Sequence, residues 1–324
     1  AELVVHAAAG HLRERELDPG SARLSRRASF VTAVVAATLL ADLIASGHFI
    51  PSGEPGVFGR GATCVLLQSR VDAVISGIVA EDCAEVLRFS PVVPRRLLDA
   101  TGYTRNFPHL CGTIMSLDAP NGTLVAHPVE DSRLGMLPAG CYPAYPAIAA
   151  RGPLPQNGAT LDLGDAFVFR NEPSDDPYRL QIFHQRELVR MGESHQVLAW
   201  RELWLRRAGA IFESLELDVS IVVASDPFFG RGGKLHARNQ IDDKLKYEAV
   251  LSVSGGGTVA LSSFNYHRDQ LAHTFGLVCE DGSVAHTACV GFGLERISIA
   301  LFDRHGCDVR DWPLSVLDAL DLNA

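Results

Sequence analysis

Two strand-like segments joined by a polar linker, within residues 160–191, constrain the fold of this chain more than any other feature. The linker NEPSDDPY contains Pro, Ser and Asp, which favour turns, so the two strands are predicted to form a hairpin. The first strand carries Phe167, Val168 and Phe169 and runs directly into Arg170. A buried charge is costly unless another group meets it. The sequence therefore predicts an antiparallel strand pair and a binding partner for Arg170.

The rest of the chain alternates between strand-like and helix-like segments. Long strands outnumber the helices that connect them, which favours a largely antiparallel sheet. The predicted fold class is therefore α+β, with an antiparallel sheet flanked by helices. The segments behind this prediction are a helix at 193–215, a strand at 220–225, alternating strands at 247–280 with an SGGG turn, a strand at 286–293 and a helix at 294–306.

Residues 1–50 are predicted to form a helical lead-in, and residues 51–324 one large domain with an inserted helical segment at about 193–244. Within the lead-in, residues 25–47 place two arginines before an apolar run, as an export signal does. Asp42 interrupts that run, which is then too short to span a bilayer. We therefore expect a buried helix of a soluble protein there, with no membrane association.

Charge and cysteine usage narrow the function classes. The formal net charge is -9 and the pI is about 5.7, which disfavours a protein that wraps RNA or DNA, because phosphate neutralisation needs a basic surface. The seven cysteines are odd in number and form no CxxC pair, so a disulfide scaffold is not expected. Reduced thiols are typical of the cytoplasm, where we expect this protein.

Side-chain alternation in the predicted hairpin suggests a nucleotide site. In the first strand Arg170 and Glu172 would share a face, and in the second strand Arg179, Phe183 and Glu187 would share a face. The paired strands would therefore form one surface with two arginines, an aromatic ring and two carboxylates. An arginine matches phosphate geometry, an aromatic ring stacks on a base, and a carboxylate accepts a hydrogen bond from an exocyclic amine. The alternative is a solvated strand pair with surface salt bridges, which contribute little stability.

A second signal lies near the end of the chain, in GFGLER (291–296). Two glycines at a strand-to-helix junction allow close approach of a ligand to the backbone, and a helix N-terminus attracts anions. Arg296 adds a full positive charge in the first helical turn. Taken alone, the same residues would fit a tight turn with a surface arginine.

Together, FRNE, the following R…F…E strand and GFGLER resemble motifs 2 and 3 of class II aminoacyl-tRNA synthetases. With TGYTRNFPHLCG and AGCYPAYP upstream, residues 51–305 resemble the catalytic core of the zinc-dependent seryl-tRNA synthetases of methanogens. The resemblance implies that ATP binds here with Mg²⁺. It also implies the ATP contacts: Arg170 at the α-phosphate, Glu172 at the adenine amino group, Phe183 under the ring, Arg179 and Arg296 at the outer phosphates, and Leu180 and Ser263 nearby. Arg170 and Arg296 would be the catalytic residues.

The same resemblance implies one catalytic zinc ion held by Cys141, Glu187 and Cys289, with an open position for the substrate's α-amino group. Glu187 and Asn265 would contact the amino acid. The other cysteines, Cys64, Cys83, Cys111, Cys279 and Cys307, are expected to be packed or incidental thiols, and His184 and His286 to be structural.

Residues 1–50 contain no long heptad arm and no strongly basic stretch that would hold tRNA. In this respect the chain resembles the bacterial amino acid:[carrier protein] ligases, which are truncated relatives of the zinc-dependent seryl enzymes. That resemblance implies activation of glycine or alanine and transfer to the phosphopantetheine thiol of an acidic carrier protein, without tRNA. A minimal seryl-tRNA synthetase and a non-catalytic paralogue are the alternatives.

Three further expectations follow from the resemblance. The basic segment 228–240, with Arg231, Lys234 and Arg238, would dock the carrier protein, although an ordinary solvated helix fits the pattern as well. A homodimer is expected from the class II fold. Ala260 stands where ordinary seryl enzymes have a glutamate near the ATP-bound metal, so another acid would have to serve Mg²⁺.

Overall fold

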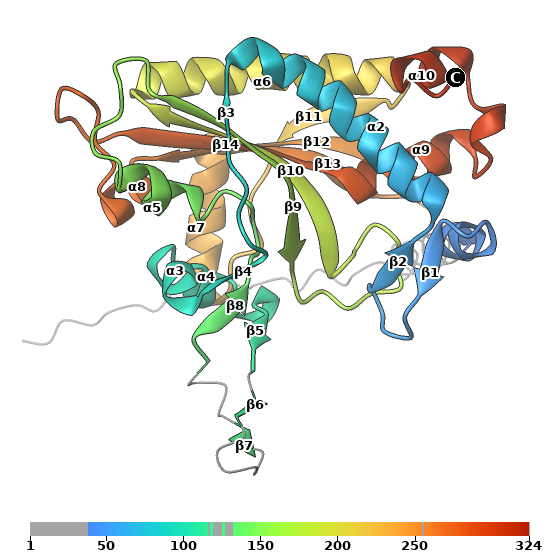
Figure 1. Cartoon of the computed structure of the whole chain (residues 1–324), viewed down its shortest axis with the longest axis horizontal. Coiled ribbons are helices and arrows are strands. Elements are labelled where there is room, and N and C mark those ends of the chain that lie inside the picture. Colours follow the sequence, from blue (N-terminus) through green and yellow to red (C-terminus); the bar gives the residue numbers. More distant parts are fainter. Residues whose placement is uncertain (1–37, 116, 119–124, 127–131, 255, 324) are drawn as a thin grey trace, which may run out of the picture.

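A seven-stranded sheet forms the centre of the molecule (Figure 1). The computed structural model describes residues 38–115, 117–118, 125–126, 132–254 and 256–323, and most of the predicted lead-in lies outside the described residues. All neighbouring strands of the sheet are antiparallel except β3 and β9, which confirms the predicted fold class. In order across the sheet, the strands are β11 (Val219–Val223), β12 (Lys246–Ser252), β13 (Thr258–Arg268), β14 (His286–Gly293), β10 (Ile182–Gly192), β9 (Ala159–Phe169) and β3 (Glu85–Val86).

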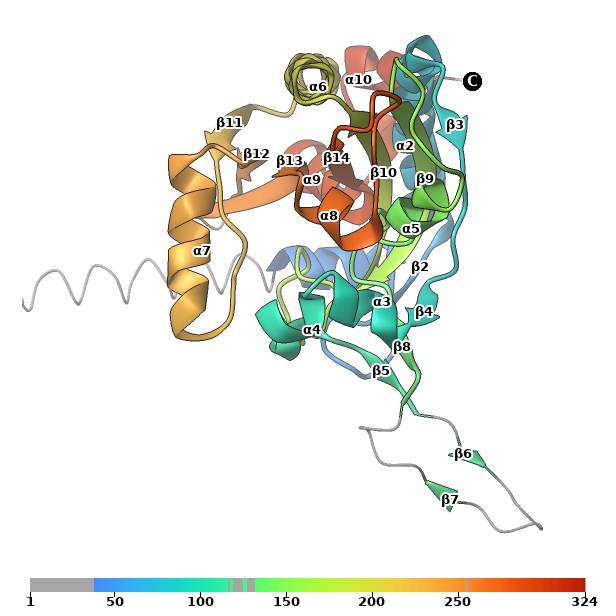
Figure 2. The ribbon, with the colours of Figure 1, turned by 90° about the vertical axis from the view of Figure 1, so that its left-hand side faces the viewer.

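Three long helices cover one face of this sheet (Figure 1, Figure 2). They are α2 (Ala62–Val79), α6 (Ser194–Ser214) and α9 (Leu294–His305). Along α6 the buried residues Val197, Trp204, Ala208 and Phe212 recur at the spacing of a single helix face, and that face packs against the sheet. Burial of these stripes against the strands forms the main hydrophobic core.

One described helix, over residues 62–82, is long and apolar enough to cross a membrane by length and composition. Its buried side chains Leu67, Val71 and Ile75 belong to the same core as α6 and α9. These contacts make it a core helix of the fold. Val65 and Leu66, by contrast, are 52% and 47% exposed.

The opposite face of the sheet carries shorter elements, and α7 stands beside it at the β11 edge (Figure 2). The predicted inserted range 193–244 comprises α6, β11 and α7, of which α6 packs in the main core. The remaining elements are β1 (Phe49–Pro51), β2 (Phe58–Arg60), β4 (Val92–Pro94), α3 (Arg95–Ala100), α4 (Tyr103–Asn106), β5 (Thr113–Ile114), β6 (Leu117–Asp118), β7 (Val125–Ala126), β8 (Leu134–Met136), α5 (Ala144–Ala149), α7 (Gly230–Asp242), α8 (Gln270–Phe275) and α10 (Leu314–Ala319), with short 3₁₀ turns between them.

The connection between β9 and β10 is longer than the predicted linker, since it spans residues 170–181. Arg170, Glu172 and Arg179 lie in this connection, so the prediction that strand alternation orients them is wrong. Local hydrogen bonds replace the ladder here. For example, the N–H of Tyr178 donates to Oδ1 of Asp176 at 3.0 Å. The orientation of the two arginines and of Glu172 therefore depends on the loop.

Glu187 lies opposite a bulge in β9. The register of the β9–β10 pair shifts between Arg186 and Leu188. On the β9 side, Gly164 has a φ of +63°, a left-handed conformation that glycine adopts at little steric cost, and its N–H donates to Oδ1 of Asp162 at 2.8 Å. Because a bulge re-aims neighbouring side chains, this irregularity helps to direct Glu187 into the face opposite α6.

Candidate active site

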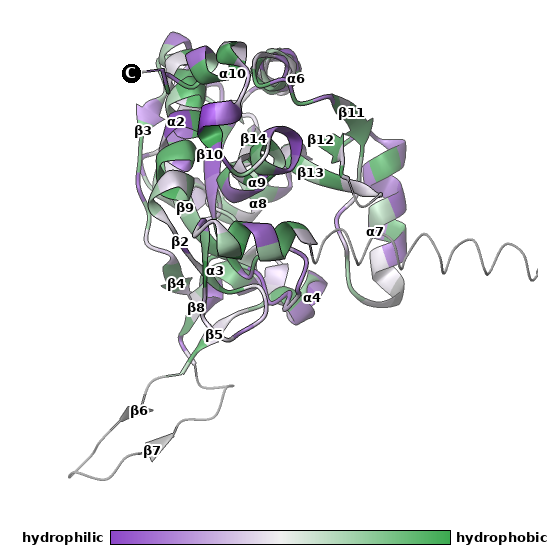
Figure 3. Ribbon diagram, turned by 90° about the vertical axis from the view of Figure 1, so that its right-hand side faces the viewer, coloured by the Kyte–Doolittle hydropathy of each residue, from purple (hydrophilic) through white to green (hydrophobic). Residues whose placement is uncertain are grey.

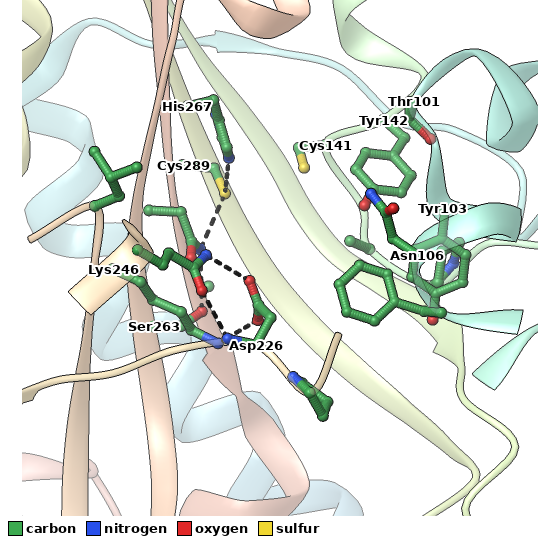
Figure 4. Close-up of a pocket in the computed structure, with 18 of the residues that line it drawn as sticks. Thr101, Tyr103, Asn106, Cys141, Tyr142, Asp226, Lys246, Ser263, His267 and Cys289 are labelled. Carbon is green, nitrogen blue, oxygen red and sulfur yellow. Dashed lines mark hydrogen bonds and ion pairs between the residues drawn. The ribbon is translucent and has the colours of Figure 1, made fainter. Parts of the chain in front are cut away.

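A cavity of about 590 Å³ opens on the sheet face opposite α6, and residues of α4, α7 and α8 contribute to its lining. Figure 4 shows some of the side chains that line it. Residues from distant parts of the chain line it. Most of the side chains predicted for ATP, the amino acid and the metal are among them, namely Cys141, Arg170, Glu172, Phe183, Glu187, Ser263, Asn265, Cys289 and Arg296. The folded chain therefore brings the two sequence signals, from the hairpin and from GFGLER, into one cavity.

The other predicted residues lie elsewhere. Leu180 is buried in the main hydrophobic core and does not line the cavity, so its side chain is not placed to contact a ligand there. Arg179 lies outside the cavity lining, 60% exposed, with its Nη1 3.7 Å from Oε2 of Glu172. Lys234 and Arg238 are exposed on α7. Arg231 lies in the same helix, and its side chain is outside the described part of the structure.

The pairing of β10, β13 and β14 determines which side chains form the floor of the site. Asn265 in β13 pairs with Cys289 in β14, so the two side chains share a face. Glu187 in β10 pairs with Gly291, two residues from Cys289 on the same face. A Cβ at Gly291 would come within 2.4 Å of Nε2 of Gln185. Glycine at this position thus keeps the floor open where β10 and β14 meet.

The two predicted catalytic arginines lie close to one another in the cavity. Arg170 donates from Nε to the carbonyl of Pro138 at 3.2 Å, and its guanidinium lies 5.4 Å from the ring centre of Phe183. Arg296 donates to the carbonyls of Tyr178 and Ala260 at 2.9 and 3.0 Å. Burial lowers the pKa of Arg296, and the neighbouring charge of Arg170 lowers it further. Two like charges held together in this way favour a bound anion between them.

Cys141, Glu187 and Cys289 form a buried donor set whose ligand atoms all lie within 4.8 Å of one another. The N–H of Cys141 also donates to Oε2 of Glu187 at 2.9 Å. The loop approaches so closely that a Cβ on Gly140 would lie 2.9 Å from the same oxygen. Burial is the main cause that raises the pKa of Glu187, and the neighbouring Cys289 raises it further.

This donor set fits zinc. Two thiols and a carboxylate are typical zinc ligands, and three protein ligands with one open position are typical of catalytic zinc sites. Enclosing acidic groups together away from water is costly unless a cation compensates them. The chemistry of these three residues therefore supports the predicted metal centre.

His267 is a site residue that sequence reasoning missed. Its Nε2 lies 3.6 Å from Sγ of Cys289 and its Nδ1 lies 3.0 Å from Oγ1 of Thr287. The side chain of Asn265 also approaches Sγ of Cys289, at 3.5 Å. Such outer contacts orient a thiolate ligand. Its spacing of two residues from Asn265 is the signal that could have found it, although the β13–β14 register shifts between Tyr266 and Arg268.

A partly buried polar network at the cavity wall was also missed. Asp226 lies between β11 and α7, and its carboxylate contacts Nζ of Lys246 at 2.5 Å and Nε2 of Gln240 at 2.8 Å (Figure 4). Lys246 in turn lies 2.9 Å from Oε1 of Glu248. This network joins α7 to β12, and no local sequence pattern predicts it.

The sheet order and the converging arginines define the class of protein, which is the catalytic fold of class II aminoacyl-tRNA synthetases. The seryl-tRNA synthetase of M. kandleri, solved with A. aeolicus tRNASec, matches with a TM-score of 0.75 at 19% identity, covering 87% of this chain and 60% of that one. Prolyl-tRNA synthetase of Giardia lamblia, solved with prolyl-adenylate, matches with a TM-score of 0.66 at 11% identity, covering 83% of this chain and 53% of that one. These likenesses show the fold. No family model matches the chain.

Sequence comparison narrows the class to a family. Amino acid–[acyl-carrier-protein] ligase 2 of Bradyrhizobium diazoefficiens is 40% identical over 294 residues, covering 87% of each chain. Ligase 1 of the same organism is 38% identical over 294 residues, covering 87% of this chain and 90% of that one. A type-2 serine–tRNA ligase of Methanopyrus kandleri is 28% identical over 151 residues, 44% of this chain and 29% of that protein. The chain belongs to the amino acid–[acyl-carrier-protein] ligase family and is a ligase.

Proposed function

We propose that this protein activates glycine or alanine with ATP and transfers the aminoacyl group to the phosphopantetheine thiol of an acyl-carrier protein. The observation that carries the proposal is the meeting of Arg170 and Arg296 with the Cys141–Glu187–Cys289 donor set in one cavity. One part of that cavity suits an anion and the other suits a metal-bound amino group. An aminoacyl-adenylate needs both.

The nucleotide would lie over the floor made by β10 and β14. Phe183 offers a ring for adenine to stack on, and Glu172 a carboxylate for its amino group. Arg170 now lies over the Phe183 ring, within reach of an α-phosphate next to that base. Arg296 would meet the outer phosphates from the cavity wall, with Arg179 joining from the β9–β10 connection. Ser263 lines the same cavity and would contact the nucleotide.

Cys141, Glu187 and Cys289 would hold zinc. As a Lewis acid, the metal would favour the neutral form of the substrate's α-amino group and fix it in place. Asn265 reaches this region beside Cys289 and would orient the amino acid. The cavity would thereby hold the carboxylate in line with the α-phosphorus, which supplies much of the rate by proximity.

The chemistry would take two steps. First, a carboxylate oxygen of the amino acid bonds to the α-phosphorus of ATP while the bond to pyrophosphate breaks. Arg170 stabilises the negative charge that develops on the α-phosphate oxygens. Second, the carrier thiolate attacks the carbonyl carbon of the adenylate. AMP leaves with the bonding electron pair, and a thioester remains.

Magnesium would accompany ATP, and Glu248 is the acid best placed to serve it. Glu248 in β12 pairs with Ser263 in β13 and lines the cavity, one strand away from Ala260. Carboxylate and hydroxyl oxygens suit Mg²⁺. A carboxylate on the neighbouring strand would thus take the place of the glutamate that is absent at Ala260.

The carrier protein would dock on α7. Lys234 and Arg238 are exposed there, together with Leu235 and Ile241, which are 62% and 47% exposed. Figure 3 shows that α7 carries both hydrophilic and hydrophobic residues. We assign Arg231 to the same surface from its place in the helix. A helix that presents basic and apolar side chains suits an acidic partner. Gln240 of α7 donates to Asp226, which in turn contacts Lys246, and this chain of contacts ties the helix to the wall of the cavity.

A homodimer would form along α2 and the β3 edge of the sheet. Exposed apolar side chains occur on α2, at Val65 and Leu66, and on the paired strands β3 and β9, at Val86 and Phe167. Apolar residues exposed on adjoining elements are typical of an interface.

A cytoplasmic location is the last part of the proposal. All seven cysteines are free, as expected for a protein of the cytoplasm.

The test is amino-acid-dependent exchange of pyrophosphate into ATP, measured with each amino acid in turn and with or without a zinc chelator. We expect exchange with glycine or alanine only, loss of exchange with the chelator, and aminoacylation of a phosphopantetheinylated carrier protein. Charging of tRNA with serine would favour the minimal seryl-tRNA synthetase instead. Absence of exchange with every amino acid would favour a non-catalytic paralogue.

A further inference from the structure

Glu295, the residue before Arg296, is a carboxylate buried at the start of α9. Only 1% of its surface is exposed, yet it accepts hydrogen bonds from three donors. Oε2 accepts from the backbone N–H of His184 at 2.7 Å. Oε1 lies 2.8 Å from Nδ1 of His184 and 3.2 Å from Nη2 of Arg60. Hydrogen bonds to a charged group are among the stronger ones in a protein.

The first of these bonds extends the sheet by one place. In the β10–β14 ladder, the last pair joins Gln185 to Gly293, where β14 ends. His184, the residue of β10 before Gln185, has no partner on β14. Its N–H donates to the Glu295 carboxylate instead. A side chain of α9 thus replaces a strand carbonyl, and β10 stays hydrogen-bonded on this side one residue beyond the β10–β14 ladder, while β9 pairs with its other side.

The residues held in this way are the immediate neighbours of the nucleotide site. His184 follows Phe183, the ring proposed to stack under adenine, and Glu295 precedes Arg296, the guanidinium proposed to meet the phosphates. Both of those side chains line the cavity. One buried carboxylate therefore fixes the backbone that carries the ring relative to the backbone that carries the charge.

Arg60 of β2 reinforces the link from outside the sheet. Besides Glu295, its Nη2 donates to the carbonyl of Ile182, the first residue of β10, at 3.1 Å. The side chain of Arg60 is 13% exposed, so the pair with Glu295 is largely shielded from solvent. The β1–β2 hairpin thereby contacts the start of β10 and the start of α9 together.

We propose that Glu295 is a positioning residue for nucleotide binding, which acts through Phe183 and Arg296 without touching ATP. The inference rests on the proposed function, because it assumes that ATP lies between those two side chains. Replacement of one carboxylate oxygen by an NH₂ group, which removes the charge and one acceptor, should leave the fold in place and loosen the relation between β10 and α9. The effect should appear in the affinity for ATP and not in the affinity for the amino acid or zinc.

The test compares Glu295→Gln with a matched control, Asp82→Asn. Asp82 also accepts from three donors, Trp200 at 3.3 Å, Trp204 at 3.0 Å and Arg207 at 2.6 Å, but it does not line the cavity. Calorimetry would give the Kd for Mg·ATP, and pyrophosphate exchange the KM for ATP and for the amino acid. We expect both ATP constants to rise about tenfold in Glu295→Gln, since a hydrogen bond to a charged group is worth about that factor. In Asp82→Asn they should stay as in the wild type, even if both variants melt earlier.

Arg60→Met provides a second variant should Glu295→Gln fail to fold. It removes one donor and leaves the N–H of His184 satisfied, so we expect a smaller rise in the same two ATP constants. The inference is overturned if these variants bind ATP like the wild type, or if Asp82→Asn weakens ATP binding equally. A wild-type protein that neither binds ATP nor exchanges pyrophosphate would overturn the proposed function itself, which is a separate result.

Discussion

The backbone N–H of Cys141 donates a 2.9 Å hydrogen bond to Oε2 of Glu187, a residue 46 positions away in the sequence. The bond holds the loop before α5 against β10 and brings the Cys141 thiol beside the Cys289 thiol of β14. A loop and two strands therefore supply one donor set, and no single element carries the metal centre.

Replacement of Cys289 by serine should weaken zinc binding and adenylate formation much more than folding stability. A serine hydroxyl is a poor zinc ligand, whereas the change in volume is small. We expect zinc content to fall and pyrophosphate exchange to drop by at least about tenfold, the scale seen when metal sites lose even an outer contact. The measurements are metal analysis, exchange and thermal unfolding.

Cys279→Ser is the matched control, because Cys279 is buried in the same hydrophobic cluster but is not part of the donor set. It should retain zinc and activity. Full zinc content and full exchange in Cys289→Ser would count against the metal assignment.

Arg170→Ala and Arg296→Ala should each lower kcat/KM for pyrophosphate exchange by about 10²–10³-fold, the range for removal of one donor to a developing charge. The reason is that both guanidinium groups face the cavity where phosphates would lie. Arg304→Ala is the control, since Arg304 is exposed near the end of α9. An effect confined to thermal stability would contradict the proposed roles.

Arg179→Ala should lower exchange less than Arg170→Ala does. The side chain of Arg179 is 60% exposed and meets Glu172 only at 3.7 Å, so it contributes little until a ligand draws it in. Steady-state exchange at varied ATP concentration measures this difference. A loss equal to that of Arg170→Ala would mean that the β9–β10 connection closes fully over the nucleotide.

The double variant Lys234→Glu, Arg238→Glu should impair transfer to the carrier protein and leave adenylation intact. Both side chains are exposed on α7, outside the cavity lining, and reversal of their charge would repel an acidic partner. Single-turnover aminoacylation of the carrier and pyrophosphate exchange separate the two steps. Arg206→Glu with Arg304→Glu makes the same charge change at exposed sites on α6 and α9. Equal loss of both steps in the α7 variant would reject the docking surface.

Asp226 should make stability dependent on acid. Burial alone would raise its pKa, but Lys246 and the hydrogen bond from Gln240 outweigh burial, and the pKa in the folded state is lowered. Because the folded value lies below the unfolded value of about 3.9, the stabilisation is present above pH 4 and is lost as the pH falls through the folded pKa. Urea unfolding between pH 3 and pH 7 measures it.

Asp226→Asn should be less stable at pH 7 and should lose less stability than the wild type on acidification. Asp281→Asn is a useful comparison, since the Asp281 carboxyl also has a lowered pKa but lies at the surface, where hydrogen bonds with Ser283 are the cause. Parallel pH profiles for Asp226→Asn and the wild type would contradict the assignment.

The fold class followed from the sequence because it depends on local patterns. Alternation predicted the long strands β9, β10 and β14, and the glycines of GFGLER marked the junction between β14 and α9, which begins at Leu294 as expected. Arg170 in the hairpin and Arg296 in GFGLER could be predicted as site residues because each lies within such a local pattern. Cys141, Cys289 and Glu187 were predicted as metal ligands from the resemblance of motifs, because no local spacing rule identifies them.

Only the tertiary structure decided how the pieces meet. The β9–β10 connection is stabilised by its own side chains, so the loop and not strand alternation orients Arg170 and Arg179. The contact of His267 with Cys289 arises from strand register, the Asp226–Lys246 pair from the packing of α7, and the Glu295–His184 bond from the point at which β14 ends. These contacts join segments far apart in the chain, and a one-residue change of register would break them while the local sequence patterns remained unchanged.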